Sequence, residues 1–289
     1  MSFLLYDQRD VEYAERRGDM RLRWLAELGA TTLQRVAFEH QGFSFGYQTP
    51  PDQYRATIGP YKNVMDRPES REQLAKLEDV LSALKRHEID VPTPRTWMLK
   101  IDDPLPEDLA FPLFVRTSTS SWKRGGESAK VRNARELRDE CELLRRAFHW
   151  DATILARQWV DLAIAGRWRY GNVPVEIRVW VVDGVPFAWS FHYLHALNEP
   201  KGFPPSDADQ RIIAGYARQM AKPFNSRLIA FDFVLDVAGK WQFLEAGPGA
   251  CSGTAHEAVF KAVASRLAGN SGNFSNDAVG GLLPTESSL

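Results

Sequence analysis

The spacing of apolar residues predicts several helices along the chain. Between Ser70 and Pro92, apolar residues recur three to four positions apart, as on one face of an amphipathic helix. Ser70 is suited to cap the N-terminus of this helix, and Pro92 ends the segment. The same pattern predicts helices over residues 134–148, from about Ser206, and over residues 253–268.

Apolar and polar residues alternate in the stretches between these helices, as expected for strands with one buried face. The stretches are residues 111–120, 153–162, 173–193 and 231–247. The dipeptide Asp183-Gly184 lies inside the third stretch and favours a tight hairpin turn. Residues 237–240 separate two apolar runs of the fourth stretch, so a second hairpin is predicted there.

The two ends of the chain differ from this central part. Residues 1–60 are rich in aromatic side chains, with a short apolar run at 2–7 and a helical stretch at 20–28. The Pro- and Gly-rich residues 47–60 indicate a linker or the edge of a lid. Residues 269–289 are rich in Gly, Ser and Asn, which predicts a flexible tail.

Two acidic residues lie in the apolar runs of the last predicted hairpin. Asp232 and Glu245 are on its two strands, where side chains on the same face are close enough to share an ion. A buried carboxylate needs such compensation, because removing a charge from water is costly. Two hard oxygen ligands on a rigid hairpin suit Mg²⁺, which keeps several water ligands. The alternative is that both acids form ordinary ion pairs at the surface.

Composition and charge narrow the classes of protein that remain. The chain has 289 residues, 44% hydrophobic and 25% charged, with a formal net charge of −1. This is ordinary globular composition, and nothing in it indicates binding to nucleic acid. Its two cysteines cannot form a disulfide framework or a cysteine-rich zinc site. The sequence has no pattern of a signal peptide or a membrane span, so we expect a soluble cytoplasmic protein.

Other reactive residues form less specific patterns. His192 and His195 are three residues apart, but on a strand-like segment they would point to opposite faces. No third zinc ligand follows at a suitable spacing, so both are interpreted as polar residues at the rim of a pocket. Cys251 and His256 would allow a thiol nucleophile, although a small side chain lining a pocket is the simpler interpretation of Cys251.

Five motifs occur in a characteristic order between residues 70 and 268. They read KLEDVLSALKRHEIDVPTP, PLFVRTSTSSWKRGGES, ILARQWVDL, VEIRVWVVDGVPFAWS and FDFVLDVAGKWQFLEAG. In order and character they resemble the ATP-grasp superfamily. There, the corresponding motifs are a helix begun by lysine, a basic strand with a phosphate loop, an adenine-binding segment, a Glu-x-Arg strand and a metal-binding hairpin.

The resemblance implies an α+β chain with the ATP-grasp fold, in which the nucleotide is held between two α+β lobes. Residues 1–69 are then an N-terminal α/β region that precedes the ATP-grasp lobes. The central lobe spans 70–160 and the C-terminal lobe, with the metal site, spans 161–268. Residues 269–289 remain as the predicted tail.

The resemblance also implies roles for individual residues. ATP is expected to be bound by Lys76, Arg116, Lys123, Gln158, Trp159, Val160 and Asp161. The first three are basic and suit the phosphates, the next three offer backbone groups and apolar walls to adenine, and the last suits the ribose hydroxyls. Asp232 and Glu245 are the expected Mg²⁺ ligands. The family has a third, metal-binding Asn where this chain has Gly247, and Gly247 offers no side-chain oxygen.

Arg178 is the expected catalytic residue. It lies two residues after Glu176 in an apolar alternation, so both are expected on one face of the strand together with Trp180. A guanidinium in such a strand needs an anionic partner, which is either Glu176 or a phosphoryl oxygen of the reaction.

The implied reaction is ADP-forming ligation, in which ATP activates a carboxylate as an acyl-phosphate that an amine then attacks. Two alternatives remain open, namely phosphorylation of a hydroxyl and a regulatory nucleotide-binding protein, which Gly247 favours. Substrates are expected to be small-molecule or peptide carboxylates and amines. Ala230 stands where relatives that join small amino acids have an arginine, which argues against a D-alanine-type substrate. The aromatic residues that either shape the acceptor site or form a core are Trp24, Phe43, Phe45 and Tyr47.

Overall fold

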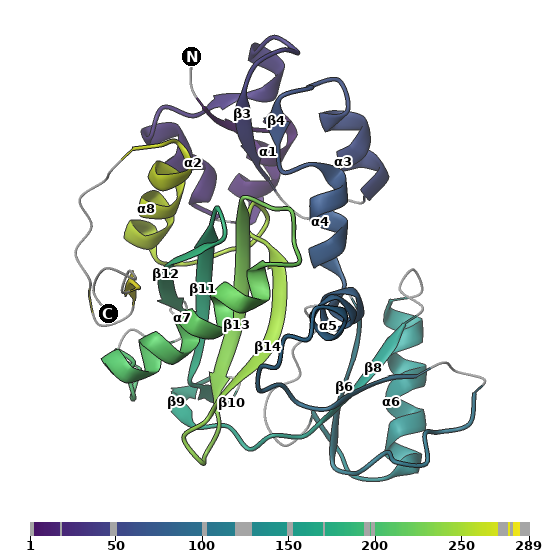
Figure 1. Ribbon diagram of the computed structural model, residues 1–289. Helices are drawn as coiled ribbons and strands as arrows, with labels where there is room; N and C mark the ends of the chain where they lie inside the picture. Colours follow the sequence, from purple (N-terminus) through teal and green to yellow (C-terminus); the bar gives the residue numbers. More distant parts are fainter. Residues whose placement is uncertain are drawn as a thin grey trace.

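The computed structural model consists of three sheet-containing parts and one small hairpin (Figure 1). It describes residues 3–17, 19–46, 51–99, 103–118, 129–148, 153–169, 171–193, 197, 200–270, 277 and 280–283. Within these ranges, every helix is too short or too polar to span a bilayer. The mixture of helices with parallel and antiparallel sheets confirms the predicted α+β class.

The N-terminal part is a parallel sheet of order β2-β1-β3-β4. Its strands are β1 (Leu4–Tyr6), β2 (Thr31–Thr32), β3 (Gly42–Phe45) and β4 (Val64–Met65). The helices of this part are α1 (Gln8–Arg17), α2 (Arg21–Glu27), the short η1 (Leu33–Arg35) and α3 (Pro51–Ile58). The predicted strand at 2–7 and helix at 20–28 are therefore confirmed, whereas the predicted linker at 47–60 contains α3.

Two helices replace the single one predicted from Ser70. They are α4 (Pro68–Ala75) and α5 (Leu77–Arg86), and Lys76 between them has an extended backbone, with φ −117° and ψ 125°. Pro68 begins α4, where a missing N–H costs nothing. Ser70 therefore does not cap a helix, and its hydroxyl donates to the carbonyl of Asn225 instead.

A smaller antiparallel sheet of order β5-β8-β6-β7 forms the lobe at the lower right of Figure 1. Its strands are β5 (Thr96–Leu99), β6 (Leu113–Thr117), β7 (Lys130–Val131) and β8 (Ile154–Gln158). Helix α6 (Ala134–Ala147) packs on this sheet through Leu137 and Leu144, and the Asn133 side chain caps its N-terminus. Both strand stretches and the helix predicted here are confirmed.

The largest sheet is antiparallel and has the order β14-β13-β11-β12-β15. The strands are β11 (Glu176–Val182), β12 (Val185–Phe191), β13 (Leu228–Leu235), β14 (Trp241–Pro248) and β15 (Gly280–Leu282), beside the separate hairpin of β9 (Ile164–Trp168) and β10 (Gly171–Pro174). The β11–β12 turn has positive φ at Asp183 (50°) and Gly184 (77°), as its Asp-Gly sequence predicts. Residues 280–282 of the predicted flexible tail instead pair with β12 as β15.

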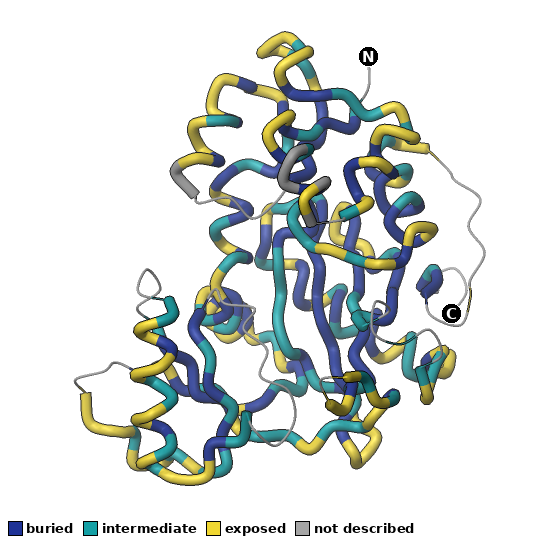
Figure 2. Tube along the Cα trace, turned by 180° about the vertical axis from the view of Figure 1, so that it is seen from behind, coloured by how far each residue is buried: buried dark blue, intermediate teal, exposed yellow. Residues whose placement is uncertain are grey.

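Helices cover both faces of this sheet, and buried residues follow its strands (Figure 2). One face packs against α7 (Asp207–Ala221) and α5. The other packs against α8 (Glu257–Leu267) and the N-terminal part. The Ser206 hydroxyl caps α7 as predicted, whereas α8 begins at Glu257, several residues later than the sequence pattern suggested.

The two faces of β11 belong to different cores. Ile177, Val179 and Val181 lie in the core beneath α7, which confirms the predicted alternation. Trp180 lies on the other face but is fully buried in the core shared with α8 and the N-terminal strands. The prediction that Trp180 faces an open site is therefore wrong, because α8 covers that half of the face. Of the N-terminal aromatic residues, Trp24, Phe43 and Phe45 belong to this same core, and Tyr47 lies outside the described residues.

Candidate active site

The β13–β14 hairpin places Asp232 and Glu245 directly opposite each other, as the sequence predicted. A β-bulge follows this pair, where the register shifts between Asp232 and Phe233. At the turn, the Asp236 carboxylate accepts hydrogen bonds from the backbone N–H groups of Ala238 (2.9 Å) and Lys240 (2.8 Å). Both ends of the hairpin are thus fixed, and the two carboxylates are held side by side.

Arg178 lies opposite Asp232 on the neighbouring strand β11. Its Nε and Nη2 donate to the two oxygens of Asp232 at 2.8 and 2.7 Å, and its Nη1 donates to the Gly253 carbonyl at 2.5 Å. Burial lowers the pKa of Arg178, but the Asp232 carboxylate outweighs this and raises it above its usual value. The partner of Arg178 is therefore Asp232, and not Glu176 as considered from the sequence.

Arg116 on β6 forms the matching ion pair with Glu245, with 2.5 Å between Nη1 and Oε2. This contact joins the smaller antiparallel sheet to the large one. Arg157 on β8 adds a second connection, because its Nη1 donates to the Leu244 carbonyl at 2.6 Å. Burial and the neighbouring Arg116 lower the pKa of Arg157 to about 9, so it stays cationic at neutral pH. The sequence reasoning missed Arg157, although a lone arginine in the apolar strand ILARQ was a signal for it.

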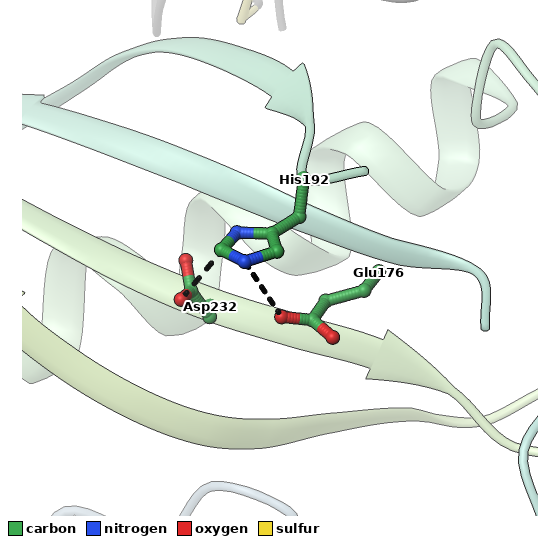
Figure 3. Close-up of side chains that lie close together, drawn as sticks. All are labelled: Glu176, His192 and Asp232. Carbon is green, nitrogen blue, oxygen red and sulfur yellow. Dashed lines mark ion pairs between the residues drawn. The ribbon is translucent and has the colours of Figure 1, made fainter. Parts of the chain in front are cut away.

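On the other side of Asp232, His192 lies between two carboxylates (Figure 3). Its Nε2 is 3.7 Å from Oε1 of Glu176, and its Nδ1 is 3.8 Å from Oδ2 of Asp232. Glu176 and Asp232 are 3% and 2% exposed. Tyr193 hydrogen-bonds to Glu176, and burial together with that carboxylate raises the pKa of its phenol. The sequence reasoning took His192 for a rim residue, and His195 lies outside the described residues.

The segment expected to bind adenine connects β8 to β9 and carries several polar contacts. The backbone N–H groups of Gln158 and Trp159 donate to the carbonyls of Arg95 (2.8 Å) and Pro112 (3.0 Å). The indole N–H of Trp159 donates to Asp161 at 2.8 Å. Gln158 and Asp161 are exposed, and Trp159 and Val160 are partly buried. The structure therefore keeps the four predicted residues together in one connecting segment.

A lysine that the sequence reasoning missed lies against this segment. Lys130, on β7, has its Nζ 5.0 Å from the centre of the Trp159 ring and 3.9 Å from Oδ1 of Asp161. Its position directly after the polar loop was the available signal. Of the other basic residues predicted to bind phosphate, Lys76 is exposed between α4 and α5, and Lys123 lies outside the described residues.

Gly247 and Cys251 lie beyond Glu245. Gly247 pairs with Ala230, and a Cβ atom added there would be 3.1 Å from the Ser252 hydroxyl oxygen. Burial raises the pKa of the Cys251 thiol, which disfavours the nucleophilic thiolate. His256 is engaged elsewhere, since its Nδ1 accepts from the Val259 N–H and its Nε2 faces Asp277. The thiol–imidazole alternative is therefore not formed.

Comparison with known proteins gives the family of this arrangement. Residues 104–267, more than half of the chain, match a family described as an ATP-grasp domain, family 3 of its clade. No curated protein sequence matches the chain.

Solved structures of ATP-grasp proteins share the fold. N5-carboxyaminoimidazole synthetase from Staphylococcus aureus, complexed with ADP, superposes with a TM-score of 0.62 at 12% identity, over 98% of this chain and 80% of that one. A RimK domain ATP-grasp protein from Sphaerobacter thermophilus gives 0.56 at 13% identity, over 92% and 98%. D-alanine–D-alanine ligase from Bacillus anthracis, complexed with ATP, gives 0.54 at 14% identity, over 85% of each chain. The predicted ATP-grasp fold is confirmed.

Proposed function

The chain belongs to this ATP-grasp domain family, and we propose that it is an ATP- and Mg²⁺-dependent ligase that joins a carboxylate to an amine and releases ADP. The observation that carries the proposal is the pairing of Asp232 with Glu245, each held by an arginine from a different strand. Paired carboxylates bordered by guanidinium groups offer charges of both signs to a metal–phosphate group.

The donor set fits Mg²⁺. Asp232 and Glu245 supply hard carboxylate oxygens from neighbouring strands, and Mg²⁺ takes one or two such ligands and completes its shell with water and phosphate. When bound, the ion neutralises charge on the phosphate oxygens. Gly247 adds no oxygen, so water fills that position.

The surroundings of Glu245 fit a polyphosphate. Arg116 and Arg157 both lie beside this carboxylate, so two guanidinium groups face one acid at this end of the site. A guanidinium binds phosphate oxygens through two parallel hydrogen bonds. We assign phosphate binding to Arg116, with Lys76 and Lys123 as further contacts, and adenosine binding to the segment from Gln158 to Asp161.

The proposed reaction has two steps. A carboxylate oxygen of the substrate bonds to the γ-phosphorus of ATP while the bond between that phosphorus and the β–γ bridging oxygen breaks, which gives ADP and an acyl-phosphate. The amine nitrogen then bonds to the acyl carbon, inorganic phosphate leaves, and the nitrogen loses a proton. Arg116 and Arg178 stabilise the negative charge that develops on the transferred group.

The solved relatives support nucleotide binding and a ligase-type reaction. Two of them are complexed with ADP or ATP, and their names denote a synthetase and a ligase. At 12–14% identity they do not identify the substrates, so the carboxylate and the amine are left as chemical classes.

Gly247 favours a second candidate function, a nucleotide-binding regulatory protein with little turnover. Loss of one metal ligand weakens the metal position while nucleotide contacts elsewhere remain. A kinase that phosphorylates a hydroxyl is a third possibility, since it needs the same phosphate site.

Release of ADP distinguishes these candidates. The full-length protein is incubated with Mg²⁺ and ATP and screened against carboxylates, with and without amines. Hydroxylamine replaces the amine in a parallel series, because it converts an acyl-phosphate into a hydroxamate. A ligase releases ADP with a carboxylate and yields a hydroxamate. A kinase releases ADP with a hydroxyl compound and yields none, whereas nucleotide binding without any ADP release would support the regulatory protein.

A further inference from the structure

Asp232 has potential cation ligands on both sides of its strand. Glu245 lies opposite it on β14, and Glu176 and His192 lie towards β11 and β12. We propose that Glu176, His192 and Asp232 form a second metal site, distinct from the Mg²⁺ position at Glu245, that binds a first-row transition-metal dication such as Mn²⁺ or Zn²⁺ in preference to Mg²⁺. This site does not depend on the proposed ligase reaction.

The geometry leaves room for an ion among the three side chains. One ligand atom from each residue lies within 4.8 Å of the others, and the imidazole stands between the two carboxylates (Figure 3). The nitrogen–oxygen separations of 3.7 and 3.8 Å are longer than a hydrogen bond. Bonds of about 2.1 Å to a central ion place neighbouring ligand atoms roughly 3.0–3.4 Å apart, so a contraction of a few tenths of an ångström closes the site.

Both carboxylates are held by outer partners, which is the arrangement typical of metal ligands. Arg178 binds both oxygens of Asp232, and Tyr193 hydrogen-bonds to Glu176. Each carboxylate oxygen has two acceptor positions, so these contacts leave one available on each bonded oxygen.

The backbone fixes His192 beside Glu176. The N–H of His192 donates to the Glu176 carbonyl at 3.0 Å, one step beyond the paired residues Ile177 and Phe191. The imidazole thus continues the β11–β12 ladder and cannot move far from the carboxylate. Its side chain is 15% exposed, which gives an ion a route from solvent.

Charge and ligand type decide which ion is favoured. Around His192, two buried carboxylates face one guanidinium, that of Arg178, so the local charge favours a cation. An imidazole nitrogen is a poor ligand for Mg²⁺ but a good one for transition metals, whereas carboxylates accept both. The nitrogen of His192 therefore gives this side of Asp232 a different metal preference from the all-oxygen side at Glu245.

The test uses Mn²⁺ alone, without nucleotide, on the full-length protein. Titration followed by electron paramagnetic resonance measures bound Mn²⁺, and pulsed measurements detect coupling to a directly bonded nitrogen. We expect nitrogen coupling in the wild type and its loss in His192→Ala, with Mn²⁺ affinity about tenfold or more weaker, by analogy with losing a ligand-orienting contact. Glu176→Gln should also weaken binding about tenfold.

Two matched variants control for indirect effects. His87→Ala removes an exposed histidine at the end of α5, and Glu245→Gln alters only the all-oxygen side, so both should keep the nitrogen coupling. Thermal melts confirm that each variant is folded. The proposal is overturned if Mn²⁺ does not bind, if it binds without nitrogen coupling, if His192→Ala binds it equally well, or if equimolar Mg²⁺ displaces it. Any of these results would leave an imidazole that only separates two carboxylates. The measurement involves no ATP, so its failure is distinguishable from failure of the ligase function.

Discussion

Arg178 and Asp232 face each other across β11 and β13 and are joined by two hydrogen bonds, of 2.8 and 2.7 Å. Asp232 is 2% exposed, so this guanidinium compensates a carboxylate that has almost no contact with water. Arg178 therefore has a structural part in addition to its proposed catalytic one. Any variant of Arg178 must be judged on stability and on turnover separately.

Replacing Arg178 with Met is expected to destabilise the fold, because it leaves the Asp232 carboxylate buried and unpaired. We expect a loss of about 3 kcal/mol in the free energy of unfolding, measured by urea denaturation. The double variant Arg178→Met with Asp232→Asn should lose less than the sum of the two single changes. Additive losses would show that the pair contributes nothing to stability.

Turnover of the folded Arg178→Met protein should fall about a hundredfold, as when one charge-stabilising donor is removed from an active site. ATP affinity should change far less, because the proposed contact forms with the transferred group. Steady-state ADP release gives the first quantity and calorimetry the second. Unchanged turnover in the folded variant would remove Arg178 from the proposed mechanism.

Asp232→Asn and Glu245→Gln are each expected to weaken the Mg²⁺–ATP complex about tenfold or more, because each removes one of two charged oxygen ligands. Titration calorimetry with and without Mg²⁺ measures the effect. Asp183→Asn is the matched control, since it removes a carboxylate from a turn with positive φ that Asn also tolerates. If all three variants bind Mg²⁺–ATP as the wild type does, the assigned metal ligands are wrong.

Gly247→Asn should restore a ligand that relatives have. An Asn side chain at this position follows Glu245 by two residues on β14, so both point to the same face of the sheet. We expect Mg²⁺–ATP affinity to rise about tenfold. Gly247→Ala is the control, because it meets the same close approach to the Ser252 hydroxyl without adding an oxygen. An equal effect of both variants would point to backbone rigidity and not to metal ligation.

The hairpin chemistry could be predicted from the sequence because it is local. Asp232, Glu245 and the turn between them lie within one short segment, and alternation fixes which side chains share a face. Trp180 was misplaced for the opposite reason: alternation gives its face, but only the tertiary packing of α8 shows that this half of the face is closed.

The residues missed around the site come from distant segments. His192 lies 40 residues from Asp232 in sequence, and its neighbours follow from the strand order β12-β11-β13, which no local pattern contains. Lys76 was predicted inside a helix because the apolar spacing continues across it, yet its backbone is extended. Apolar periodicity does not detect a break that keeps the buried face in phase.

The N-terminal part and the large sheet share one core, although the sequence predicts them as separate regions. Phe45 on β3 is 2% exposed, and its ring lies 5.6 Å from that of Phe260 on α8. Trp180 on β11 belongs to the same cluster. Because neither part buries these side chains without the other, the two are expected to unfold together.

Phe45→Ala should therefore destabilise the whole assembly by about 3–5 kcal/mol, since it opens a cavity at the centre of the shared core. Urea denaturation followed by tryptophan fluorescence and by far-UV circular dichroism should give one transition at the same midpoint for both signals. Phe38→Ala is the control, because Phe38 is 55% exposed and its removal should cost less than about 1 kcal/mol. Two separated transitions, with only one of them shifted by Phe45→Ala, would show instead that the N-terminal part folds by itself.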